Sequence, residues 1–192
     1  MRSTLFIGLL CGLTTPSAFA QDARERSEPA TLFDAGSVSL NFIGGAYLES
    51  FGGNDETLTF GGIDLEYFCF DDVAFTVEAL GYAVDQVDPD AAAFGFSLGT
   101  RWYFWKPSDS LGVFVEGAVG LTESDARLPT PNGTHFNFTA LAGIGAKAQL
   151  TDRISLIAAG RYFHLSNANM QGDERNPSID AFGGFAGISI SF

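Results

Sequence analysis

The sequence predicts an all-β fold, an eight-stranded antiparallel up-and-down transmembrane β-barrel. The hydrophobic fraction is 46%, with 19 Phe and 23 Gly, yet the apolar residues are finely interleaved with Gly, Ser and charged residues. After Gln21, no apolar run approaches the roughly 20 residues of a membrane-spanning helix. From Gly36 onward, segments of period two recur at the spacing of strands and turns, which is typical of a membrane barrel.

Residues 1–20 are predicted to form a signal peptide. Arg2 supplies a positive charge, an apolar stretch follows, and "SAFA" gives the small-residue spacing that signal peptidase requires before Gln21. Residues 21–36 are polar and irregular, so we expect a flexible periplasmic segment there. Residues 37–192 are then expected to form the barrel in the bacterial outer membrane.

The breaks between strands alternate in length. "FDD", "KPSDS" and "LTD" are short, whereas the intervening breaks are longer, as expected for periplasmic turns and outer loops. The chain ends on Phe192, which resembles the terminal aromatic by which outer-membrane barrels are recognised for assembly. Because backbone groups must be paired in lipid, the last strand should close onto the first. The expected strands are 37–49, 57–70, 73–85, 92–105, 111–122, 135–149, 153–166 and 180–192.

The alternation assigns side chains to lipid or to the lumen. In the sixth strand Phe136, Phe138 and Ile144 share one parity, and Asn137 and Lys147 share the other. A soluble lipocalin-like barrel with reversed faces is disfavoured, because the Phe-rich parity would overfill so narrow an interior. A small barrel holds little water, so the charges on the inward parity must pair with one another. These charges are Asp64, Glu66, Glu78, Arg101, Glu116, Lys147 and Arg161.

Composition also limits the partners and cofactors. A net charge of −13 disfavours nucleic acid as a partner. Cys69 is the single Cys of the mature chain and is interpreted as a small apolar side chain. Two His and one mature Cys provide no zinc ligand set, and we expect no metal and no cofactor. The acidic "DQVDPDA" could bind a divalent cation, although such loops are usually only solvated. His135 is interpreted as an exposed loop residue.

The last two strands place three reactive side chains on one external face. His164 and Ser166 continue the outward parity of the seventh strand, and Asp180 shares the outward parity of Phe182. A barrel with a periplasmic N-terminus sends its seventh strand outward, so the three are expected at the outer rim. A Ser nucleophile, a His base and an orienting carboxylate are the components of an ester hydrolase.

The loop after Ser166 offers donors for an oxyanion. Asn167 and the backbone amides that follow it, at Ala168 and Asn169, are the candidates. A purely structural interpretation also stands, because polar residues cost little in the wet headgroup belt and His-x-Ser is a short pattern. Spacing alone leaves both interpretations open.

"FHLSNANM…NPSIDAFG" resembles the signature of the PagL-type lipid A 3-O-deacylases, eight-stranded outer-membrane barrels that remove an ester-linked acyl chain from lipid A. The resemblance implies His164 as the base, Ser166 as the nucleophile and Asn167 beside the oxyanion site. It covers the end of the chain, and the rest matches in architecture and length.

Three features depart from the family pattern. Asp180 stands where the family usually has Glu, "QGDERNPS" is longer than the usual loop, and Asn169 replaces a common Gly. Asn tolerates positive φ better than most residues, so a tight turn is still expected there. Glu174 competes as the acid, but its mid-loop position favours solvation.

The sequence therefore predicts a serine esterase that hydrolyses the 3-position acyl ester of lipid A in the outer leaflet. Its expected partners are lipopolysaccharide and membrane lipids, and a homodimer is left open. One alternative is a non-enzymatic barrel with a structural or surface-contact role. Another keeps the esterase chemistry but takes a phospholipid as substrate.

Overall fold

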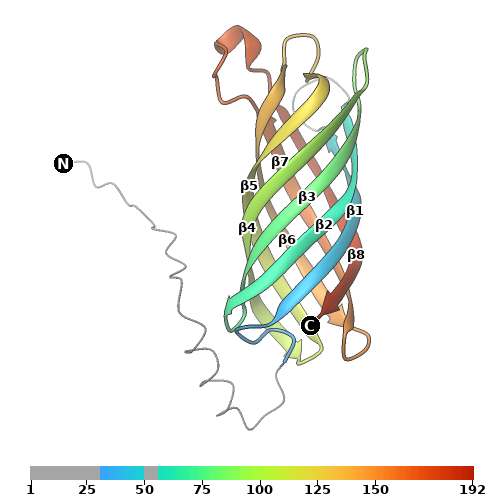
Figure 1. Ribbon diagram of the computed structural model, residues 1–192, viewed down its shortest axis with the longest axis vertical. Helices are drawn as coiled ribbons and strands as arrows, with labels where there is room; N and C mark the ends of the chain where they lie inside the picture. Colours follow the sequence, from blue (N-terminus) through green and yellow to red (C-terminus); the bar gives the residue numbers. More distant parts are fainter. Residues whose placement is uncertain (1–30, 50–55) are drawn as a thin grey trace, which may run out of the picture. The chain divides into compact units, whose positions relative to one another are not determined.

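The computed structural model describes residues 31–49 and 56–192. Within it, Leu32–Phe192 is a compact unit that forms a closed eight-stranded antiparallel barrel in sequential order, with β8 paired to β1, as predicted (Figure 1). None of the helices in the described part of the chain is long and apolar enough to span a membrane. The elements are β1 (Val38–Glu49), β2 (Thr57–Phe70), β3 (Val73–Asp85), β4 (Ala91–Ser108), β5 (Leu111–Leu128), β6 (Thr134–Gln149), β7 (Ile154–Ser166), the 3-10 helix η1 (Asp173–Arg175) and β8 (Ile179–Ser191).

Connections at the two ends of the barrel differ in length. The C-terminus and the turns 71–72, 109–110 and 150–153 share one end, here called the short-turn end (Figure 1). The connections 86–90, 129–133 and 167–178 lie at the opposite, long-loop end. The structure therefore shows the asymmetry that the sequence predicted.

One hairpin is longer than the sequence predicted. The stretch 124–134 was expected to be a loop, but β5 continues to Leu128 and β6 begins at Thr134. The register shifts between Glu123 and Leu128, and the Ser124 hydroxyl donates to the carbonyl of His135 at 3.0 Å, which closes the ladder above the shift. His135 is exposed, but it lies within β6 and not in a loop, and its Nδ1–H donates to the Ser124 carbonyl at 2.9 Å.

The signal peptide expected over 1–20 and most of the segment expected to be flexible, 21–30, lie outside the described residues. The end of that segment is packed. Phe33 is fully buried, with its ring centroid 4.7 Å from that of Tyr103 and 6.1 Å from that of Phe68. Leu32 and Phe33 are therefore packed and not flexible, and Phe33 fills the lumen at the short-turn end.

The middle of the lumen holds the seven charges that parity assigned to it, each with a side chain no more than 4% exposed and each in an ion pair with a charge of opposite sign. Glu116 bridges Arg101 at 2.9 Å and Arg161 at 2.6 Å, so the network is continuous across the interior. The remaining contacts are Arg101–Asp64 at 2.7 Å, Lys147–Glu66 at 2.7 Å and Arg161–Glu78 at 2.5 Å. The prediction of mutual pairing is confirmed.

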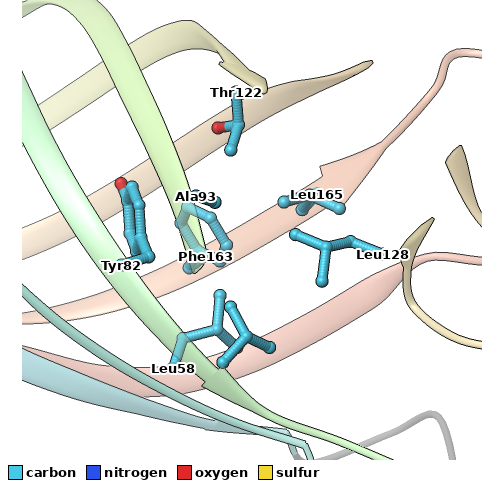
Figure 2. A pocket seen from close by; sticks show the side chains of 8 residues that line it. Leu58, Tyr82, Ala93, Thr122, Leu128, Phe163 and Leu165 are labelled. Atoms are coloured by element: carbon cyan, nitrogen blue, oxygen red, sulfur yellow. The ribbon is translucent and has the colours of Figure 1, made fainter. Parts of the chain in front are cut away.

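Toward the long-loop end the lumen is filled by apolar side chains. The Tyr47 ring stacks on Phe163 with centroids 4.6 Å apart and on Phe60 at 4.7 Å. Beyond them, the space that Figure 2 shows is too small for a water molecule. Its lining residues are Leu58, Tyr82, Val84, Ala93, Thr122, Leu128, Phe163 and Leu165. Packing thus occupies the described interior, and the outer face is left for other roles.

Candidate active site

The β7–β8 hairpin brings the three predicted residues to one outward-facing site. Strand pairing sets His164 directly opposite Asp180, and Ser166 ends β7 two residues later on the same face. The intervening Phe163 and Leu165 are buried in the lumen at 1% exposure each, so the predicted outward parity is confirmed. All three residues lie at the long-loop end of the barrel.

A continuous chain of hydrogen bonds joins the three side chains. His164 Nε2 lies 3.0 Å from Ser166 Oγ, and His164 Nδ1 lies 2.8 Å from Asp180 Oδ1. A carboxylate only accepts, so the Nδ1–H donates to Asp180 and the Nε2 lone pair accepts from the serine hydroxyl. This is the arrangement in which a histidine can take a proton from a nucleophilic serine.

Two further residues hold the Asp180 carboxylate, and the sequence reasoning missed both. The Tyr162 hydroxyl donates to Asp180 Oδ1, and the Ser178 hydroxyl donates to Oδ2 at 2.7 Å. Tyr162 shares the outward parity of His164 in β7, and both residues lie two positions from a site residue, which is the signal that could have found them. The carboxylate therefore accepts three side-chain hydrogen bonds.

Asn167 fixes the loop that follows the nucleophile. Its side chain is buried, its Nδ2 donates to the carbonyl of Arg175, and its backbone N–H donates to Asn176 Oδ1 at 3.1 Å. Ala168 and Asn169 adopt left-handed backbone conformations, with φ of 53° and 62°. Among the described residues these two amides make no hydrogen bond, so they are free donors two and three positions after Ser166 in the chain.

An open groove of about 490 Å³ begins at His164 and crosses the lipid-facing surface of β6, β5 and β4. Strand register arranges its walls in two rows. His164 is followed across the strands by Ala140, Val119 and Leu98. Ser166 is followed by Phe138, Leu121 and Phe96. The small side chain of Ala140 opens the groove directly beside the histidine.

Glu174 does not take part in the hydrogen-bond chain of this site. Glu174 is exposed within η1, and Asp180 is the acid that contacts His164. Among the described residues, no group of three or more His, Cys, Asp or Glu could hold a metal ion.

Comparison with known protein families shows which family this chain belongs to. The profile of PagL, the lipid A 3-O-deacylase, matches residues 61–189. The chain belongs to the PagL family. Membership indicates a lipid A deacylase of the outer membrane. Comparison with curated protein sequences finds no significant match.

Solved structures agree with the fold of this PagL-family chain. The outer membrane enzyme PagL is 16% identical with a TM-score of 0.63, covering 78% of this chain and 98% of that one. The N-terminal β-barrel domain of OprF from Pseudomonas aeruginosa is 17% identical with a TM-score of 0.57, covering 82% and 98%. Neisserial surface protein A is 15% identical with a TM-score of 0.56, covering 81% and 96%.

Two departures from the PagL-family pattern have a structural account. Asp180 reaches His164 despite its shorter side chain, because the two residues are directly opposed in the β7–β8 register. Asn169 adopts the positive φ for which the family commonly has Gly.

Proposed function

We propose that this PagL-family chain is a serine esterase that hydrolyses the 3-position ester-linked acyl chain of lipid A. The observation that supports it is the hydrogen-bond chain Ser166–His164–Asp180 on the lipid-facing surface. Polar groups on a surface that contacts lipid are costly, which favours a functional reason for their placement.

In the proposed reaction, the Ser166 oxygen attacks the ester carbonyl carbon while His164 Nε2 takes the hydroxyl proton. Asp180 keeps the imidazole in the required tautomer and stabilises the imidazolium. The tetrahedral intermediate collapses, the bond between the acyl carbon and the sugar oxygen breaks, and His164 gives its proton to that oxygen, which leaves as the sugar hydroxyl. Water then attacks the acyl-serine with His164 again as base, which releases the fatty acid and restores Ser166.

The negative charge on the tetrahedral oxygen needs donors that are already in place. The free amides of Ala168 and Asn169 suit this role. Asn167 acts through the loop, because its carboxamide already donates to the Arg175 carbonyl. The acyl chain of the substrate would lie in the groove, between the row of side chains that includes Ala140 and the row that includes Phe138.

The proposal includes the orientation of the chain. The long-loop end would face the cell exterior, because outer loops of such barrels are longer than periplasmic turns. Ser166 would then stand at the level of the outer leaflet, where lipid A lies. Export by a signal peptide over residues 1–20 is part of the same proposal, and the segment that precedes the barrel would lie on the periplasmic side.

Mass spectrometry of lipid A from cells that express the protein tests the function. Wild-type protein should remove one ester-linked acyl chain, and Ser166→Ala and His164→Ala should each abolish the loss. Asp180→Ala should slow deacylation less completely, because the carboxylate orients the histidine and does not attack. Ser108→Ala, on an exposed serine at the short-turn end, is the matched control and should match wild type.

Lipid analysis of the same cells distinguishes the proposed function from its two alternatives. An unchanged acyl pattern with wild-type protein would leave the non-enzymatic barrel as the explanation. Lysophospholipid formation that depends on Ser166, with intact lipid A, would redirect the proposal to a phospholipid esterase.

A further inference from the structure

The Asp180 carboxylate is held more firmly than the catalytic chain alone requires. Besides the bond from His164 Nδ1 at 2.8 Å, Oδ1 accepts from the Tyr162 hydroxyl and Oδ2 accepts from Ser178 at 2.7 Å. A carboxylate offers about four acceptor positions, so three side-chain donors occupy most of them. Hydrogen bonds to a charged group are also stronger than neutral ones.

Strand register explains how Tyr162 reaches this carboxylate. Tyr162 is opposite Phe182, so it is the diagonal neighbour of Asp180, at a separation that an aromatic side chain can span. The Tyr162 ring packs against Phe182 with centroids 5.4 Å apart and planes inclined by 57°. On the outer face, Tyr162 therefore approaches Asp180 from the side of the short-turn end, and Ser178 approaches it from the loop.

We propose that Tyr162 is a positioning residue that aligns the Asp180 carboxylate with His164, an inference that rests on the proposed esterase function. The terminal torsion of an aspartate is broad, so an unrestrained carboxylate rotates away from a single alignment. The tyrosine hydroxyl, supported by the ring contact with Phe182, restricts that rotation. A simpler explanation is an interfacial tyrosine that satisfies only its own hydroxyl.

Tyr162→Phe removes the hydroxyl and keeps the ring contact. Deacylation of purified lipid A in detergent micelles should show kcat lower by about tenfold to hundredfold, as expected for a lost hydrogen bond to a charged group. KM should be unchanged, because Tyr162 does not line the groove. Tyr67→Phe removes the same hydroxyl from the outward face of β2 and should match wild type.

A double-mutant cycle distinguishes positioning from a general structural effect. If Tyr162 acts only through Asp180, then Tyr162→Phe should cause no further loss in an Asp180→Ala background. Additive losses, a raised KM or an unchanged kcat in the single variant would overturn the inference, while loss of activity in Ser166→Ala would still support the esterase. An inactive wild-type enzyme would instead overturn the proposed function and, with it, the role of Tyr162.

Discussion

Filling the groove at Ala140 should separate acyl-chain positioning from ester chemistry. Ala140 faces His164 across the β6–β7 ladder and Val119 across the β5–β6 ladder, so a larger side chain there projects into the groove. Ala140→Phe places a phenyl ring where the first part of the acyl chain would lie. The ester must then enter the site displaced from Ser166.

The size of the effect follows from the lipid environment. Lipid tails are as apolar as the groove walls, so moving an acyl chain from the bilayer into the groove gains little transfer free energy. The groove contributes by placing the carbonyl carbon against Ser166. A misplacement of about 1 Å costs on the order of a hundredfold in rate, or about 2.7 kcal/mol of transition-state stabilisation. We therefore expect roughly a hundredfold lower rate on lipid A for Ala140→Phe.

Two substrates compared in micelles provide the assay. Lipid A reports on the groove, and a short acetyl ester reports on Ser166 and His164 alone, because its acyl group does not extend along the surface. The acetyl ester should be cleaved at nearly the wild-type rate. Ala146→Phe, on the same face of β6 but away from the groove, is the matched control. Equal losses on both substrates, or no loss on lipid A, would refute the role assigned to the groove.

Two other predictions concern the frame of the site. Arg161→Met leaves Glu78 and Glu116 with fewer partners in the lumen and should lower the free energy of unfolding by about 3 kcal/mol in urea titrations in vesicles. Arg153→Met, at an exposed position, should leave it unchanged. Equal unfolding midpoints for the two variants would contradict a stabilising role of the buried ion pairs. Asn167→Ala removes the hydrogen bond to the Arg175 carbonyl and should speed tryptic cleavage after Arg175 by about tenfold, with unchanged cleavage counting against the loop role.

The alternation of side chains along the strands accounted for most of what could be predicted from the sequence about the barrel and its site. A period of two requires only local alternation, so it correctly assigned Arg101 and Arg161 to the lumen and His164 and Asp180 to the lipid face. Mutual pairing of the buried charges followed from the small volume of an eight-stranded interior.

Register and loop geometry could not be predicted in the same way. Alternation fixes the face of a strand but not which residue opposes which, so the direct pairing of His164 with Asp180 needed the structure. The contact of Tyr162 with Asp180 could not be predicted for the same reason, because it depends on the diagonal position of the two residues in this register. The extension of the β5–β6 hairpin includes a register shift and a hydrogen bond from the Ser124 hydroxyl to the His135 carbonyl, and alternation predicts neither.

Contacts of Arg161 in the lumen also affect the geometry of the candidate site on the outer face. Arg161 points inward from β7 three residues before His164, and its guanidinium lies over the Phe185 ring of β8 at 4.3 Å. Its ion pairs with Glu78 and Glu116 tie β7 to β3 and β5 as well. A slip of one residue between β7 and β8 would exchange inward and outward faces and break all of these contacts. The buried ion pairs therefore hold the register that places His164 opposite Asp180, because the two faces of β7 share one backbone.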